Sequence, residues 1–285
     1  MTHPRTVERI FPAYGTIEGA GVKLHRAFGY EEVPSFDPFL MLDDFRAGAR
    51  PEDYLAGFPW HPHRGIETVT YMLEGRVEHG DSMGNAGNVN AGDIQWMTAG
   101  SGIIHQEMPK PVAGKMGGFQ LWVNLPKVGK MMAPRYQEIK ADSIPIESPA
   151  NGVDIRIVSG KFGSVRGPVR DILADPEYFD ISLEPGITFT HLERPAGYTV
   201  AAYVIGGSGV FGASETPARN RDMILFSDGN EIHVRSSSEG LRFLYFSGKP
   251  FREHVAWRGP IVMNTEAELQ TAFQEYRAGT FIRHH

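Results

Sequence analysis

Two pairs of polar residues carry the strongest chemical signal in this sequence of 285 residues. His61 and His63 flank a proline, and His105 and Glu107 flank a glutamine. Residues i and i+2 point to nearly opposite sides of a helix but to the same face of a strand, where their α-carbons lie about 6.6 Å apart. On neighbouring strands the two pairs could bring three imidazoles and one carboxylate to one divalent cation.

Short runs rich in β-branched and aromatic residues supply the strands that such a site needs. Each run ends at turn residues, which favours an all-β sandwich or barrel over an alternation of strands and helices. Pro62 suits a strand start or an edge, and a glycine-rich turn, Ala99–Gly102, precedes the second pair. The predicted strands include Glu67–Leu73, Asp93–Met97, Phe119–Leu125, Asp154–Gly160, Thr199–Ile205 and Leu241–Gly248.

A weak internal repeat indicates two domains. Tyr71–Gly80 resembles Tyr203–Gly212, and a polar stretch that contains prolines, Glu138–Val153, reads as a connection between them. We therefore expect an N-terminal, metal-binding domain over 1–140 and a C-terminal domain over 141–285. Aligning the repeats without gaps puts Glu193 and Pro195 where the first histidine pair stands, so the second domain is expected to lack a metal.

One helix is predicted, near 265–278, as a cover on a β surface. Thr265 and Glu268 have the spacing of a capping box, and Gly279 suits the position after the helix.

Composition excludes several classes of function. The net charge of −6 and the pI near 6.0 give no general attraction to nucleic acid or to an anionic membrane. The chain has no cysteine, hence no disulfide and no thiolate ligand or nucleophile. The first residues lack the apolar core of a signal peptide, and a cytoplasmic location is expected.

Several residues near the pairs could shape a substrate pocket. Phe58, Trp60, Trp96 and Met97 could form an apolar wall for a flat substrate, although alternating core positions explain them equally well. Arg64 could orient an anionic or phenolic group, or pair with a nearby acid. His79 is expected at an exposed strand end.

Five segments of the chain resemble the pirin family of bicupins, most densely from Phe36 to Leu125. They are "FDPFLMLDDF", "HPHRGIETVTYMLEG", "GDIQWMTAGSGIIHQEMP", "GFQLWVNL" and "GPIVMN". The resemblance implies two tandem cupin, jelly-roll-like β-barrels with a short C-terminal helix. It also implies one mononuclear metal in the first barrel, with ligands His61, His63, His105 and Glu107. In many cupins the carboxylate instead follows the second histidine by four residues, and Glu67 holds that place; we expect Glu107 to be the ligand.

The resemblance implies a metal-dependent dioxygenase that cleaves a flavonol such as quercetin with O2. Fe(II) is the first choice of metal, and Mn, Ni, Cu, Co and Zn stay open. Glu107 or Glu67 would take the proton of a substrate hydroxyl. The alternative is a non-enzymatic, redox-sensitive iron protein that acts as a regulator through a protein partner, since nothing in the sequence indicates direct binding of nucleic acid or membrane. A third possibility is a structural bicupin with a closed zinc site or no metal.

Overall fold

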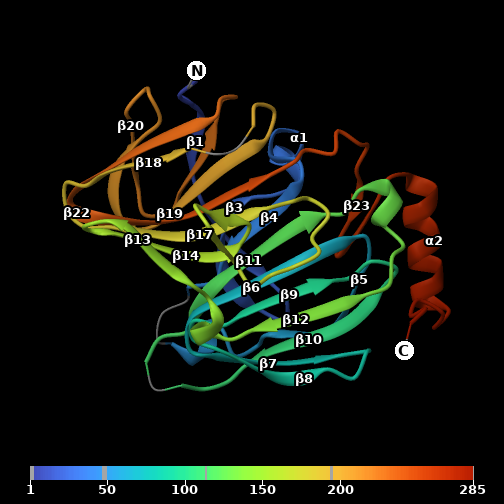
Figure 1. Cartoon of the computed structure of the whole chain (residues 1–285). Helices are drawn as coiled ribbons and strands as arrows, with labels where there is room; N and C mark the ends of the chain where they lie inside the picture. Colours follow the sequence, from blue (N-terminus) through green and yellow to red (C-terminus); the bar gives the residue numbers. More distant parts are fainter. Residues whose placement is uncertain (1–2, 47–49, 113, 193–194, 285) are drawn as a thin grey trace. The chain divides into compact units, whose positions relative to one another are not determined.

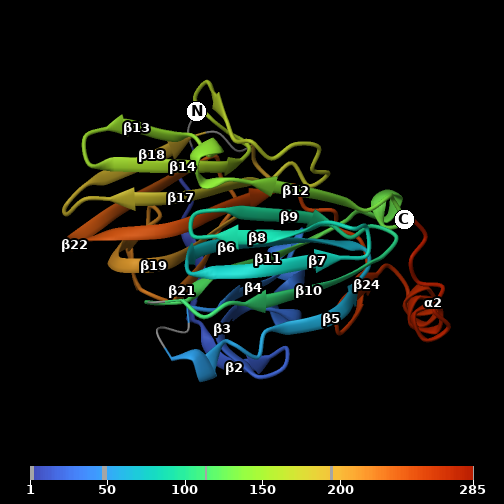
Figure 2. The same ribbon diagram turned by 90° about the horizontal axis from the view of Figure 1, so that it is seen from below.

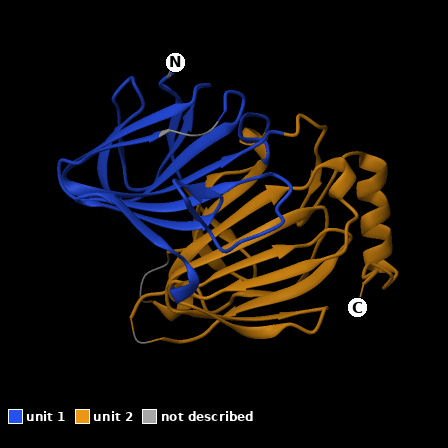
Figure 3. Ribbon diagram, viewed as in Figure 1, with its two compact units in different colours: residues 1–13, 34–38, 142–250 blue, residues 14–33, 39–141, 251–285 orange. Residues whose placement is uncertain are grey.

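Strands dominate the computed structural model, as the sequence predicts (Figure 1). The structure describes residues 3–46, 50–112, 114–192 and 195–284. The chain forms two compact units, shown in Figure 3: unit 1 comprises Met1–Ala13, Pro34–Pro38 and Asp142–Pro250, and unit 2 comprises Tyr14–Val33, Phe39–Ala141 and Phe251–His285.

Unit 2 carries both predicted polar pairs. Among its described residues one sheet has the strand order β12-β9-β6-β11-β4-β3-β2, a second has the order β5-β10-β7-β8, and β23 pairs with β24. The strands of the first sheet are β2 (Tyr14–Glu18), β3 (Val22–Phe28), β4 (Phe39–Asp44), β6 (Ile66–Glu74), β9 (Ile94–Thr98), β11 (Gly117–Asn124) and β12 (Arg135–Ile139). The remaining strands of unit 2 are β5 (Phe58–His63), β7 (Arg76–Asp81), β8 (Ala86–Asn90), β10 (Ile103–Pro109), β23 (Ala256–Arg258) and β24 (Ile261–Met263).

Unit 1 contains a large antiparallel sheet and a short hairpin. In its described residues the large sheet runs β1-β21-β19-β22-β17-β14-β13, with β18 paired to β22 and β20 paired to β19. The strands are β1 (Val7–Pro12), β13 (Ile146–Ala150), β14 (Val153–Ser159), β15 (Lys161–Phe162), β16 (Val165–Arg166), β17 (Glu177–Leu183), β18 (Thr188–Leu192), β19 (Thr199–Phe211), β20 (Thr216–Arg219), β21 (Asp222–Phe226) and β22 (Glu231–Gly248). Alternate side chains of these strands form one apolar core that includes Ile155, Phe179, Val204 and Phe243.

The six predicted runs coincide with strands β6, β9, β11, β14, β19 and β22, apart from the end residues Asp93, Leu125 and Gly160. The stretch Glu138–Val153, predicted as a connection, contains strand as well: it holds the end of β12, all of β13 and the start of β14. β12 and β13 stand at the ends of their sheets. Edge strands accept polar residues and prolines such as Pro149, and so they resemble linkers in the sequence.

The C-terminal helix α2 (Glu266–Arg277) confirms the predicted capping box. The Thr265 hydroxyl accepts a hydrogen bond from the Glu268 amide (3.2 Å), and the Glu268 carboxylate accepts one from the Thr265 amide (2.9 Å). Both views place α2 beside the β23–β24 end of unit 2 (Figures 1 and 2). A short helix α1 (Val33–Phe36) and four 3-10 turns at Tyr30–Glu32, Pro51–Asp53, Lys127–Gly129 and Ala141–Ser143 complete the described helical elements.

Residues 251–285 lie in unit 2, although the sequence placed them with the second domain. Their apolar side chains form a buried cluster, and Ile104 of β10 packs against it. This cluster contains Ala256, Ile261, Met263, Leu269, Ala272 and Phe281. Burial of these side chains therefore carries the end of the chain back to the unit that holds the histidines. No helix in the described ranges is long and apolar enough to cross a membrane.

Candidate metal centre

Two adjacent antiparallel strands bring the histidines together. On β5 and β10, His61 lies opposite His105, and His63 lies opposite Ile103. The register then shifts between His105 and Glu107, so that Glu107 faces Phe58 on β5 and His79 on β7. The expected meeting of two same-face pairs on neighbouring strands therefore occurs for His61, His63 and His105.

The three imidazoles converge through their Nε2 atoms. His61 Nε2 lies 3.0 Å from His63 Nε2 and 2.9 Å from His105 Nε2, and the three residues form a group able to hold a metal ion. Nitrogen ligands bind such ions at about 2.0–2.1 Å, so both spacings are short enough for the three residues to hold one ion.

Backbone carbonyls determine which nitrogen of two of these rings carries the proton. His61 Nδ1 lies 2.8 Å from the Pro59 carbonyl oxygen, and His63 Nδ1 lies 3.1 Å from that of Pro260. A carbonyl only accepts, so both Nδ1 atoms carry hydrogen, and in the neutral rings that metal ligation requires both Nε2 atoms present lone pairs. Lone pairs facing each other at 3.0 Å repel. A cation among the three Nε2 atoms removes that repulsion, so these residues fit a metal.

Burial keeps two of the rings neutral, as metal ligation requires. Desolvation lowers the pKa of His63 and of His105 well below the ordinary value, and the neighbouring histidines lower both further. The Pro260 carbonyl opposes the shift at His63.

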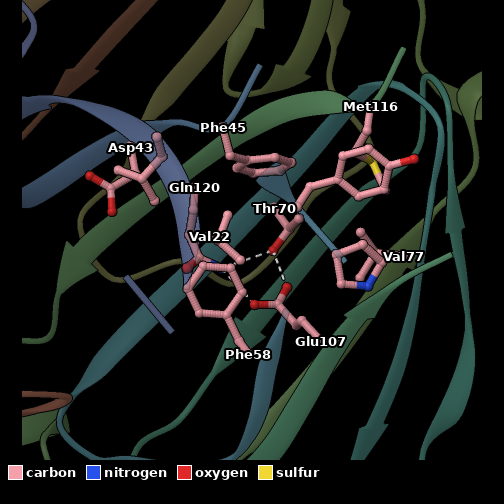
Figure 4. Close-up of a pocket in the computed structure, with 12 residues that line it drawn as sticks. Val22, Asp43, Phe45, Phe58, Thr70, Val77, Glu107, Met116 and Gln120 are labelled. Atoms are coloured by element: carbon pink, nitrogen blue, oxygen red, sulfur yellow. Dashed lines mark hydrogen bonds between the residues drawn. The ribbon is translucent and has the colours of Figure 1, made fainter. Parts of the chain in front are cut away.

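Glu107 lies on the same strand as His105, but its carboxylate is held by other side chains. Thr70 Oγ1 donates to Oε1 (2.8 Å) and Gln120 Nε2 donates to Oε2 (2.9 Å). Figure 4 shows Glu107 turned toward both, beside a small pocket of about 30 Å³. The group of mutually close ligand atoms in the described residues contains the three histidines without Glu107.

Glu67 lies on the face of β6 opposite to the face that carries Thr70. It pairs with Thr98 and Val123, whereas Thr70 and Gln120 face Glu107. Residues 67 and 70 point to opposite sides of β6. Thr98 Oγ1 donates to Glu67 Oε1 (2.6 Å), and burial raises the pKa of Glu67 to about 7 in spite of this bond. The structure therefore does not bring Glu67 to the histidines, which corrects its expected place as an alternative carboxylate at the site.

His79 is buried, contrary to the prediction of an exposed strand end. Its ring lies 5.5 Å from that of His105 and stacks on Tyr136 at 5.0 Å, and its Nε2 lies 3.2 Å from Asp81 Oδ2. The spacing His79-x-Asp81 on β7 repeats the same-face pattern of the two recognised pairs. That repetition was the available sequence signal for a third polar pair inside the barrel.

A cleft of about 680 Å³ opens over His61 and His63. Its walls are largely aromatic, with Phe58, Trp122, Trp257 and Tyr30, and its polar lining comprises Glu18, Arg26, Asp43 and Gln120. Arg26 donates two hydrogen bonds of 2.8 Å to Asp43 and contacts Glu18 at 2.8 Å. The cleft shares Asp43, Phe58 and Gln120 with the small cavity beside Glu107.

Of the five predicted pocket residues, Phe58 lines this cleft and the other four lie elsewhere. Trp60 is 54% exposed and points away from the face that His61 and His63 share. Trp96 is fully buried on the same face of β9 as Thr98, and Met97 packs in the core with Ile66 and Trp122. Arg64 is buried against the C-terminal segment. Alternation turns Trp60 and Trp96 away from the cleft, whereas Met97 shares the sheet face of Trp122 but is buried in the core beside it. The indoles that line the cleft are those of Trp122 and Trp257.

Comparison with known families supports the same architecture. The family model described as Pirin matches residues 21–123, and the model described as Pirin C-terminal cupin domain matches residues 178–282. The chain belongs to the pirin family. The chain thus contains the two cupin domains of a bicupin, and the predicted fold is confirmed.

Relatives and solved structures align over almost the whole chain. A pirin-like protein of Caulobacter vibrioides is 43% identical, over 97% of this chain and 99% of its own. A Pseudomonas aeruginosa protein with the provisional name quercetin 2,3-dioxygenase is 42% identical, over 98% and 99%. The crystal structure of quercetin 2,3-dioxygenase from Acinetobacter baumannii superposes with a TM-score of 0.90 at 31% identity, over 97% of this chain and 98% of that one.

Proposed function

We propose that the protein is a metal-dependent dioxygenase that cleaves flavonols such as quercetin with O2. The observation that carries the proposal is the set of three converging imidazoles beside an aromatic cleft. The names of two relatives, one of them known by its crystal structure, point to the same reaction.

Four residues hold the metal in this proposal. His61, His63 and His105 supply neutral Nε2 atoms, and Glu107 supplies a carboxylate that Thr70 and Gln120 orient. The metal, Fe(II) as first choice, supplies Lewis acidity toward a hydroxyl and its neighbouring carbonyl. A carboxylate with three imidazoles and no sulfur suits such a hard-to-borderline ion.

The cleft residues bind and orient the substrate. Trp122 and Trp257, whose rings are 5.8 Å apart, offer flat apolar faces to a planar polyphenol. Asp43 and Glu18 accept hydrogen bonds from phenolic hydroxyls away from the histidines. A carboxylate oxygen of Glu107 would take the proton of the substrate hydroxyl. Holding substrate and O2 together gives much of the rate gain, and the products, a ring-cleaved ester acid and carbon monoxide, balance flavonol plus O2 without another reactant.

The test is reconstitution of apoprotein under anaerobic conditions with each candidate metal, followed by quercetin and air. Loss of the flavonol absorbance with release of one carbon monoxide per quercetin is the expected result. His105→Ala and Glu107→Gln should abolish or greatly reduce turnover. His233→Ala is the matched control, because His233 lies in unit 1, half exposed and paired with Glu231, and it should leave turnover unchanged.

One metal bound per chain without turnover of quercetin, whichever metal is used, would refute the dioxygenase. That outcome would leave the alternative, a metal-dependent regulator that acts through a protein partner. A partner whose affinity differs between Fe(II) and Fe(III) protein would then support it.

A further inference from the structure

Arg64 joins the first histidine pair to the end of the chain. It follows His63 directly, and its side chain is 2% exposed. Its Nη1 donates to Glu275 Oε2 (2.6 Å), and its Nη2 donates to the Phe281 carbonyl oxygen (2.9 Å). The guanidinium carbon also lies 4.1 Å from the centre of the Phe281 ring. These partners of a buried charge all come from residues 275–281.

The hairpin β23–β24 contacts the turn that begins at His63 through backbone groups. Pro260 accepts from His63 Nδ1 (3.1 Å), and the Val262 amide donates to the Arg64 carbonyl (3.1 Å). Gly65 has a φ of +77°, and a β-carbon there would lie 2.0 Å from the Val262 carbonyl oxygen. The buried Lys130 ammonium donates to the carbonyls of Gly65 (2.8 Å) and Val262 (3.0 Å). Residues 63, 64 and 65 are thus each in contact with residues 260–262.

Phe281 reaches the turn before the second histidine pair as well. Gly102, in the turn between β9 and β10, has a φ of +140°, and a β-carbon there would lie 2.9 Å from the Phe281 carbonyl oxygen. Ile104, next to His105, packs on the apolar cluster that contains Phe281. The turn after His63 and the turn before β10 therefore both contact C-terminal residues, which lie more than 150 residues away along the sequence.

We infer that residues 259–263 and 275–283, here called the C-terminal clasp, are a positioning element of the metal centre, so that metal binding and docking of the clasp stabilise each other. The clasp positions His63 and His105, and a metal held by these histidines would in turn stabilise the two turns that the clasp contacts. The coupling is reciprocal by thermodynamic necessity. The inference rests on the metal site of the proposed function and does not depend on which reaction occurs there.

Metal affinity of clasp variants tests the inference in the full-length apoprotein. Co(II) is titrated against a competing chelator and followed by its visible absorption, which also reports the geometry of the centre. Because groups that orient metal ligands typically change affinity by about 10–100-fold, Glu275→Gln and Phe281→Ala should each raise the Kd at least about tenfold. Glu275→Asp, which keeps a carboxylate, should retain part of the affinity. Arg64→Lys should add little to Glu275→Gln, since both changes break one connection.

Glu266→Gln is the matched control. Glu266 stands on the same helix, but its partner is the exposed Arg258 at 3.6 Å, and the Kd should stay within twofold of wild type. Hydrogen exchange gives a second readout, in which Co(II) should slow exchange in residues 275–283 of the wild-type protein.

Three results would overturn the inference. One is a wild-type Kd in Glu275→Gln and Phe281→Ala even though their apoproteins melt at lower temperature, because the clasp would then be merely structural. Another is unchanged exchange in 275–283 when Co(II) protects β5 and β10. The third is wild-type protein that binds no Co(II), which would remove the metal site itself. Normal metal binding without turnover of quercetin would refute the proposed dioxygenase activity but would not affect the inference about the clasp.

Discussion

Glu67 should lower the stability of the folded protein above neutral pH, and the substitution Glu67→Gln should restore that lost stability. Its pKa is about 7 in the folded protein against an ordinary value of 4.5, because burial disfavours the charged carboxylate. Below pH 4.5 the group is protonated in both states and has no effect. Between pH 4.5 and pH 7 the Glu67 carboxyl ionises in the unfolded chain but stays protonated in the folded protein. The free energy of unfolding therefore falls as pH rises. Above pH 7 the loss is constant.

The size of the penalty follows from the two pKa values. A difference of about 2.5, at about 1.36 kcal/mol for each pKa unit, gives about 3 kcal/mol. The variant should therefore exceed wild type by about 3 kcal/mol at pH 8 and by less than about 1 kcal/mol at pH 5. For a chain of this size that corresponds to several degrees of Tm at pH 8, at about 2–4 °C per kcal/mol. The Thr98 hydroxyl can still donate to the glutamine oxygen, so the existing hydrogen bond survives.

Thermal melts and urea titrations of wild type and Glu67→Gln from pH 5 to pH 8, with metal removed, measure the difference. Glu266→Gln, the same change at an exposed position, should follow wild type at every pH. A stability difference that does not grow with pH, or a variant less stable than wild type at pH 8, would show that Glu67 is not held protonated by burial. Turnover by the metal-loaded Glu67→Gln protein should persist, since the carboxylate lies on the face of β6 away from the histidines.

Two further predictions concern the metal and the cleft. Metal at a hundredfold excess over its Kd should stabilise the wild-type protein by about 2.7 kcal/mol, and chelation should reverse the rise in Tm. Metal should not raise the Tm of His105→Ala. A rise equal to that of the wild type would mean that the metal binds elsewhere. Trp257→Ala should weaken binding of quercetin, measured by quenching of tryptophan fluorescence, because Trp257 forms part of the cleft wall. Trp60→Ala should bind normally, since Trp60 is exposed on the other face of β5; equal losses in both variants would refute the assignment of the cleft.

Strand alternation made much of the site predictable. The i, i+2 spacing of His61 and His63 needs only a strand to put both imidazoles on one face, and a β pattern surrounds the pair. The same logic placed His105 beside Glu107. Nearness in sequence to a ligand did not identify the cleft residues. Trp60 and Trp96 point to the other face of their strands, and Met97, although on the face of Trp122, is buried in the core. Glu67 followed a spacing rule of other cupins, whereas the period of β6 turns it away from Thr70 and Glu107.

The sequence by itself determined the all-β class, the tandem arrangement, the cap of the last helix and the two polar pairs, because these depend on residues close together along the chain. Only the tertiary structure decided that β5 lies beside β10 and that Trp122 and Trp257 line the cleft. It alone also decided that Pro260 contacts His63 and that Phe281 contacts the turn before β10. Such contacts come from burial of apolar side chains between distant segments, as in the cluster around Ile261 and Phe281. Non-local burial has no fixed spacing, and so it leaves no period in the sequence to read.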